Sequence, residues 1–252
     1  MITDAEPIVG DDLRLTKSNE FSFVVAIEIR EPGREEYTFC TGSIISKIHV
    51  LTAAHCFEGD ERKSVEVLSG SHNLNECKRH RVAKLVTYEM WAKKYQKTFV
   101  ENIKDANDIA ILTLAEKVAL PKKKSACFSK KRTENLYGLD ARMVGWKTES
   151  ENSGTNLYDA DVTILTTEAC NEFINLRNKQ ERYISEAHLC VIGGPRMVGN
   201  IGDSGAPLVY KNKKVLGVLK AVYPDNGPSS PGLNIFTSID PYKEFIRSSL
   251  IG

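Results

Sequence analysis

The sequence predicts an all-β protein, either a sandwich or a barrel, and three observations lead to this fold class. Short runs rich in β-branched residues recur along the 252-residue chain, each bounded by Gly, Pro, Asn, Asp or Ser. Only two segments space their apolar residues as a helix does. The 41% hydrophobic and 27% charged residues are typical of a globular protein and exclude a disordered or collagen-like chain.

The expected strands are distributed over both halves of the chain. They are residues 21–29, 43–51, 65–68, 82–87, 109–114, 162–165, 208–210 and 215–222. The lysine-rich polar stretch 117–132 is predicted to connect an N-terminal half to a C-terminal half. The length would allow two domains, but all-β barrel proteins of this size often form one structural unit.

Two helices are expected among these strands. Asp240 is an N-cap residue followed by Pro241 at the first helical position, and apolar residues then recur at helical spacing. A C-terminal helix is therefore predicted over about 240–250. A shorter helix is predicted to start near Thr167, with Cys170 on its apolar face.

Charge and hydropathy argue against two classes of partner. The 34 basic residues balance the 33 acidic ones to a net charge of +1. The basic clusters 122–124, 130–132 and 211–214 are interpreted as solvated surface rather than polyanion sites, so we expect no nucleic-acid partner. No apolar run approaches the roughly 18 residues needed to cross a bilayer, so we expect no membrane partner either.

The cysteines indicate the redox compartment. The chain has six, and none forms the Cys-x-x-Cys pair that is usual for zinc. An even number of well-separated cysteines suggests disulfides and an oxidising compartment, although six reduced thiols in a cytosolic protein would give the same count. They are Cys40, Cys56, Cys77, Cys127, Cys170 and Cys190. The first twelve residues hold no secretory hydrophobic segment, so an exported protein would already have lost its signal.

Three short stretches supply the residue types of nucleophilic catalysis. The sequence LTAAHC contains His55, NDIAIL contains Asp108, and GDSGAP contains Ser204. A histidine that titrates near pH 6.5 can take the proton of a serine hydroxyl and later return it. A buried carboxylate holds the correct histidine tautomer, and glycines beside the serine let the backbone aim N–H groups at a developing oxyanion.

Each stretch alone is weak evidence, but together and in this order they resemble the chymotrypsin/trypsin-like serine protease family. Three further stretches strengthen the resemblance: FCTGS at 39–43, VGW at 144–146 and NIFT at 234–237. The family's mature N-terminus resembles Ile8-Val9-Gly10.

The resemblance implies two packed six-stranded antiparallel β-barrels and a C-terminal helix. It places barrel one at about 21–116 and barrel two at about 133–239. Residues 8–252 would form the protease domain, and 1–7 would be a leader or an activation remnant.

The resemblance also implies a role for each site residue. His55 and Asp108 would come from the first barrel and Ser204 from the second, with the N–H groups of Gly202 and Ser204 as the oxyanion hole. The α-ammonium of Ile8, once freed by cleavage, would pair with Asp203. The long segment 88–107 is expected to form a wall over the cleft.

The specificity pocket implied by the resemblance is narrowed by side chains and has no carboxylate at its base. Val198 stands where trypsin-like members carry an aspartate, and Val222 and Asn234 stand where glycine is frequent. A substrate Lys or Arg would find no partner in such a pocket. We therefore expect elastase-like preference for small or medium apolar residues, with chymotrypsin-like preference for aromatics as the alternative. Lys220 departs from the family pattern and is expected near Asp108.

The disulfides follow from the same resemblance. Cys40–Cys56 matches the family's bridge around the histidine, and Cys170–Cys190 matches the bridge around the short helix. Cys77–Cys127 is a tentative pairing of the remaining two. Ala141 and Tyr210 stand where another family bridge would be.

The predicted function is therefore a secreted, monomeric serine endopeptidase that cleaves through an acyl-enzyme. Its partners would be protein or peptide substrates and protein inhibitors. We expect no cofactor and no metal, since Ser71 stands where calcium-binding members carry an acidic ligand. The alternative from another class is a catalytically silent homologue that acts as a binding protein.

Overall fold

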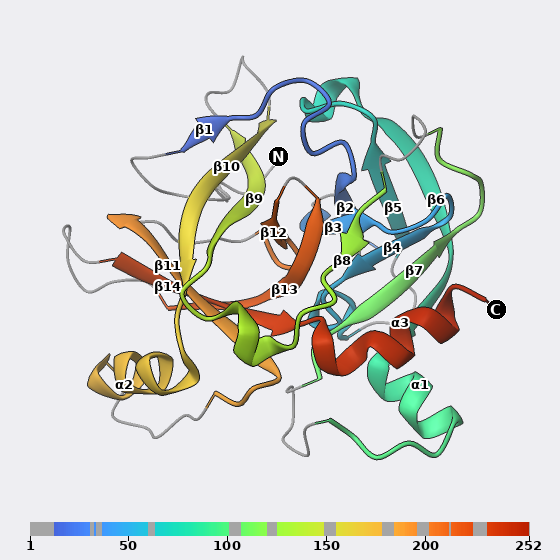
Figure 1. Cartoon of the computed structure of the whole chain (residues 1–252). Coiled ribbons are helices and arrows are strands. Elements are labelled where there is room, and N and C mark those ends of the chain that lie inside the picture. Colours follow the sequence, from blue (N-terminus) through green and yellow to red (C-terminus); the bar gives the residue numbers. More distant parts are fainter. Residues whose placement is uncertain are drawn as a thin grey trace.

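The computed structural model describes eleven stretches of the chain. They are 13–30, 33, 37–59, 64–100, 107–119, 125–148, 155–177, 184–195, 202–211, 213–223 and 231–251. Figure 1 shows two groups of strands side by side, with β2–β7 on the right and β9–β14 on the left. Within these stretches no helix is long and apolar enough to cross a bilayer.

The first group is a closed antiparallel barrel in the order β2-β3-β4-β7-β6-β5. Its strands are β2 (Val24–Arg30), β3 (Tyr37–Ile44), β4 (His49–Thr52), β5 (Ser64–Ser69), β6 (Lys78–Thr87) and β7 (Ala110–Leu114). Fully buried apolar side chains such as Val25, Ile27 and Leu51 fill its interior. Burial of these β-branched and leucine side chains is the main favourable term in closing the barrel.

The second barrel closes because β9 pairs with both β10 and β12, in the order β9-β10-β11-β14-β13-β12. Its strands are β9 (Asp140–Thr148), β10 (Thr155–Ile164), β11 (His188–Pro195), β12 (Pro207–Tyr210), β13 (Lys214–Tyr223) and β14 (Pro231–Ser238). Two short strands join it from outside: β1 (Arg14–Leu15) pairs with β10, and β8 (Cys127–Phe128) runs parallel to β13. The predicted fold class of two six-stranded barrels is confirmed.

The helices lie outside the barrels. They are α1 (Tyr88–Lys94), α2 (Thr167–Arg177) and α3 (Lys243–Ser249), with 3-10 turns η1 (His55–Phe57), η2 (Leu74–Glu76), η3 (Thr133–Leu136) and η4 (Asp240–Tyr242). α2 begins at the predicted residue, and Pro241 lies in the turn that leads into α3. Thr166 caps α2, because its hydroxyl oxygen accepts a hydrogen bond from the N–H of Ala169. Asp240 is not the predicted N-cap, since Ile239 holds that position without a side-chain cap hydrogen bond and Pro241 lies in the first turn of η4.

Helix α1 was not predicted, and it changes the interpretation of the long segment before Asp108. Thr87 caps the helix by accepting a hydrogen bond from the N–H of Met90. The helix packs on the C-terminal region, where the Tyr88 ring lies 4.8 Å from the Tyr242 ring and the Trp91 ring 5.7 Å from the Phe245 ring. The described part of the segment, residues 88–100, thus covers α3 (Figure 1).

The predicted strand 43–51 is interrupted by a turn. β3 ends at Ile44 and β4 begins at His49. The Ser46 hydroxyl oxygen accepts hydrogen bonds from the N–H groups of Ile48 and His49 and bonds the Nδ1 of His49 at 2.7 Å. A serine that bonds its own following backbone favours a turn over a continuous strand.

Candidate active site

His55 and Asp108 meet because two neighbouring strands of the first barrel deliver them. His55 begins η1 just after β4, and Asp108 lies just before β7. These strands are paired, with Thr52 opposite Ala110. The His55 Nδ1 lies 2.6 Å from the Asp108 Oδ2, and the backbone N–H of His55 donates to the Asp108 Oδ1 at 2.9 Å. The carboxylate therefore fixes both the ring and the main chain of the histidine.

The two side chains differ in exposure, and this difference sets their chemistry. The Asp108 side chain is 4% exposed, whereas the His55 side chain is 34% exposed. Burial alone would lower the pKa of His55, but the hydrogen bond and the negative charge of Asp108 outweigh it and raise the pKa above its usual value. With Nδ1 held by the carboxylate, Nε2 is the nitrogen left for proton transfer with a substrate or a serine.

Ser204 comes from the second barrel and is held against the first. Its carbonyl oxygen accepts a hydrogen bond from the N–H of Thr41, at 2.7 Å. Thr41 follows Cys40, which is disulfide-bonded to Cys56, the residue after His55. A short path of covalent and hydrogen bonds therefore connects the predicted base to the backbone of the predicted nucleophile across the barrel interface.

Glycines on either side of Ser204 permit this close approach. Gly202 has φ +105° and Gly205 has φ +86°, and side chains are strained in both conformations. A Cβ on Gly205 would collide with the Thr41 carbonyl oxygen and the Thr52 Oγ1. The Gly-Asp-Ser-Gly stretch recognised in the sequence thus has a packing reason as well as a chemical one.

The predicted activation pair and pocket fall only partly within the described residues. Asp203 is buried, at 1% exposure, but Ile8 lies outside the described stretches. Val198 also lies outside them. Val222 and Asn234 are described, and they stand opposite each other on the paired strands β13 and β14. The two predicted wall residues are therefore neighbours.

Lys220 brings a positive charge to the site. Its Nζ lies 3.1 Å from the His188 Nε2, and its charge lowers the pKa of His55, against the larger effect of Asp108. The sequence predicts Lys220 near Asp108, and the structure brings its Nζ to His188 of β11. No sequence motif signals the Lys220–His188 contact, because it depends on the lateral order β11-β14-β13 in the second barrel.

All six cysteines are described, and two of the three predicted disulfides are present, Cys40–Cys56 and Cys170–Cys190. The tentative pairing of Cys77 with Cys127 is wrong, because both thiols are free. The two cysteines belong to different neighbourhoods. Cys77 follows η2 at the start of β6, and its thiol points at the Asn73 carbonyl at 3.5 Å, whereas Cys127 lies in β8 beside β13 of the other barrel.

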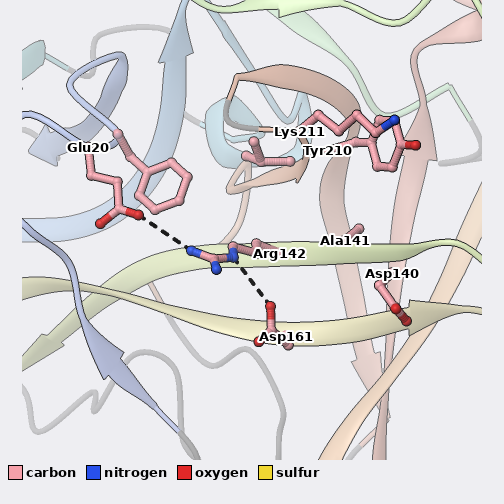
Figure 2. A pocket seen from close by; sticks show the side chains of 9 residues that line it. Glu20, Asp140, Ala141, Arg142, Asp161, Tyr210 and Lys211 are labelled. Atoms are coloured by element: carbon pink, nitrogen blue, oxygen red, sulfur yellow. Dashed lines mark hydrogen bonds and ion pairs between the residues drawn. The ribbon is translucent and has the colours of Figure 1, made fainter.

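A charged pocket of about 360 Å³ lies on another part of the molecule. It is lined by Glu20 and Phe21, by 140–142 of β9, by Asp161 and by 209–211 at the end of β12. Figure 2 shows Arg142 between Glu20 and Asp161, with nitrogen-to-oxygen distances of 3.4 and 3.3 Å. Ala141 and Tyr210, which stand in place of a family disulfide, both line this pocket. None of His55, Asp108 and Ser204 is part of its lining.

No group of three or more His, Cys, Asp or Glu side chains in the described stretches could hold a metal ion. The arrangement of His55, Asp108 and Ser204 provides an exposed imidazole oriented by a buried carboxylate, and a serine whose backbone is tied to the strand beside that imidazole. Such a set can move a proton to and from a serine hydroxyl.

Comparisons with known proteins identify the family of the chain. The family model described as Trypsin matches residues 12–246. Chymotrypsin of Phaedon cochleariae is 31% identical over 191 residues, which cover 73% of this chain and 63% of that protein. Cathepsin G of Mus musculus is 27% identical over 251 residues, covering 98% and 87% of the two chains. The crystal structure of the scabies mite inactivated protease paralogue S-D1 matches with a TM-score of 0.72 at 20% identity, covering 94% and 95%.

Proposed function

Because the chain belongs to the trypsin family of serine endopeptidases, which are hydrolases, we propose that it cleaves peptide bonds with Ser204 as the nucleophile, His55 as the general base and Asp108 as the group that orients the base. One observation carries the proposal, namely the 2.6 Å bond between the His55 Nδ1 and the Asp108 Oδ2. It leaves Nε2 as the basic nitrogen, on the side of the ring that the carboxylate does not occupy.

The proposed reaction has two halves. In the first, the Ser204 Oγ attacks the scissile carbonyl while the His55 Nε2 takes its proton, and the N–H groups of Gly202 and Ser204 bind the resulting oxyanion. The protonated His55 then donates to the leaving amine, and the acyl group stays on Ser204. In the second half, His55 takes a proton from water as the water oxygen attacks the ester. The bond between the acyl carbon and the Ser204 Oγ then breaks, His55 returns the proton to Oγ, and the acid is released. Asp108 stabilises the imidazolium that forms in both halves.

Labelling with diisopropyl fluorophosphate tests this proposal. The Ser204 Oγ would displace fluoride and become phosphorylated, because only an activated hydroxyl reacts. Ser204→Ala should remove the label and lower peptide hydrolysis by on the order of 10⁶-fold, whereas Ser71→Ala should keep both. A parent protein that hydrolyses peptides without being labelled at Ser204 would contradict the assignment.

The described wall residues support a preference for apolar substrates. Val222 and Asn234 are partners in the register of β13 and β14, so their side chains project from the same face of the sheet, and side chains at both positions would narrow a pocket lined by that face. With Val198 at the predicted base, the pocket offers no carboxylate to a Lys or Arg side chain. Hydrolysis should be fastest after small or medium apolar residues, with aromatics as the alternative. A peptide library in which Lys or Arg dominates would contradict this specificity.

A catalytically silent binding protein is the second candidate, and the Lys220 charge near His55 favours it. The Lys220 charge reduces the increase in the pKa of His55 that Asp108 causes, which makes His55 a weaker base than it would be without Lys220. Lys220 also stands where the sequence departs from the family pattern. The same labelling separates the two candidates. A silent homologue would leave Ser204 unlabelled although the protein is folded.

Secretion and activation by cleavage complete the proposal. The disulfides Cys40–Cys56 and Cys170–Cys190 are typical of an oxidising compartment, which supports a secreted protein that acts on protein substrates and is accessible to protein inhibitors.

In the proposed activation, residues 1–7 are removed and the new α-ammonium of Ile8 pairs with buried Asp203. N-terminal sequencing of active material tests it, and full activity from chains beginning at Met1 would contradict it.

A further inference from the structure

We propose that Thr41 is a positioning residue that holds the Gly202 oxyanion donor in place from the opposite barrel. This inference rests on the proposed function, in which the N–H groups of Gly202 and Ser204 bind the oxyanion. Thr41 lies in β3 of the first barrel, next to Cys40. It touches neither the reacting atoms nor a substrate, and its effect passes through the loop that carries them.

Thr41 makes three hydrogen bonds that together join β4, β3 and the Ser204 loop. Its hydroxyl donates to the Gly202 carbonyl at 2.8 Å, and its N–H donates to the Ser204 carbonyl at 2.7 Å. Its own carbonyl accepts from the Thr52 hydroxyl at 2.7 Å. Thr41 is fully buried, at 0% exposure, so water cannot replace any of these bonds.

The Gly202 carbonyl needs such a restraint. Glycine has many accessible backbone conformations, and Gly202 is held at φ +105°. The last cysteine of the chain is Cys190, so no disulfide anchors the segment around Gly202. Within the described stretches, the Thr41 hydroxyl is the side-chain group that bonds the Gly202 carbonyl. Losing the hydroxyl would leave a buried carbonyl without this donor, which favours rotation of the local backbone.

Holding two carbonyls from one residue fixes the segment between them. Residues 202–204 are bound at both ends to Thr41, and β3 is itself paired with β2 and β4. The backbone of Gly205 is packed tightly against Thr41, because a Cβ on Gly205 would collide with the Thr41 carbonyl oxygen. The directions of the Gly202 and Ser204 N–H groups therefore depend on where Thr41 stands. An oxyanion hole is effective only when its donors are already aligned.

Three variants test the inference. Thr41→Val has the same shape but no hydroxyl, Thr41→Ser keeps the hydroxyl, and Ser43→Ala is the matched control. Ser43 is two residues along the same strand and 1% exposed, and its hydroxyl has no hydrogen-bond partner in the described part of the chain. For Thr41→Val we expect kcat to fall about 10-fold with KM changed less than about 2-fold, because alignment of a donor acts on the transition state. Thr41→Ser should stay within about 3-fold of the parent and Ser43→Ala within about 2-fold.

A second readout does not depend on turnover. Amide hydrogen exchange at Gly202 and Ser204 should be faster in Thr41→Val than in the parent, Thr41→Ser or Ser43→Ala, because no hydroxyl then holds the peptide unit between Gly202 and Asp203, which lies between these two N–H groups. Unchanged exchange in Thr41→Val, or an equal loss of kcat in Ser43→Ala, would overturn the inference. If the parent protein is not labelled at Ser204, the proposed function is contradicted but the inference about Thr41 is not. The exchange measurement would still decide the role of Thr41.

Discussion

The pKa of His55 is set by burial and by charges that come from both barrels. Asp108 raises its pKa through a hydrogen bond and its negative charge, while burial and the charge of Lys220 lower it. The Nζ of Lys220 also lies against the Nε2 of His188. The balance at a single imidazole therefore depends on residues from both barrels.

Replacing Lys220 by methionine should raise the pKa of His55. His55 must be deprotonated to act as the base, so a higher pKa moves the acid limb of the kcat/KM profile to higher pH. The measurement is kcat/KM against pH for the parent, Lys220→Met and Lys214→Met. Lys214 begins the same strand and is exposed, so its replacement should leave the limb in place. An acid limb that moves to lower pH in Lys220→Met would contradict the electrostatic role of Lys220.

At the scale of single elements, local signals predicted helices better than strand boundaries. Helix α2 starts at the predicted residue, and the Asp240-Pro241 signal falls in η4, the turn directly before α3. The strand predicted at 43–51 is split because Ser46 bonds the following backbone. The hairpin β9–β10 was mostly missed, since polar residues such as Asp140 and Asn156 occupy strand positions that only tertiary packing makes favourable.

Helix α1 should contribute to stability through one buried face. Trp91 is 6% exposed and packs against Phe245 of α3, whereas Met90 on the same helix is 54% exposed. Trp91→Ala should reduce the free energy of unfolding by about 3 kcal/mol, because it leaves a cavity among the aromatic rings. Met90→Ala is the control and should change it by less than about 0.5 kcal/mol.

Urea unfolding followed by circular dichroism measures both variants. A Trp91→Ala midpoint equal to that of Met90→Ala would show that α1 does not stabilise the C-terminal region. Diisopropyl fluorophosphate labelling of Ser204 in folded Trp91→Ala should match the parent, since α1 packs on α3 rather than on the Ser204 loop.

For the molecule as a whole, the sequence was enough to predict the two barrels and the contact between His55 and Asp108. These residues sit in short stretches whose pattern is visible without a structure. The contacts of Lys220 and Thr41 were not predictable, because each joins residues distant in the chain. Lys220 meets His188 through strand order, and Thr41 meets Gly202 across the barrel interface. Packing between barrels leaves no local pattern in the sequence.

The reactivity of the free cysteines tests the disulfide pattern of the whole molecule. Native protein treated with Ellman's reagent should show two reacting thiols, from Cys127 and Cys77, because the other four cysteines form disulfides. Cys127 is exposed and should react first. Burial raises the pKa of the Cys77 thiol and leaves less of the reactive thiolate, so Cys77 should react more slowly.

Two variants assign the phases. Cys127→Ser should remove the fast phase, and Cys77→Ser should remove the slow one. A native protein with no reacting thiol would mean that the two cysteines are bonded to each other or to another group, contrary to the structure.

The division of the site between the barrels has a consequence for biosynthesis. A ribosome makes the chain from its N-terminus, so the first barrel emerges with His55 and Asp108 already in sequence while Ser204 has not been translated. The histidine and the carboxylate then have no serine of the second barrel to activate. The site is complete only after β12 and β13 have been synthesised and docked against β3. The nascent chain therefore emerges before its own peptide bonds can meet an assembled site.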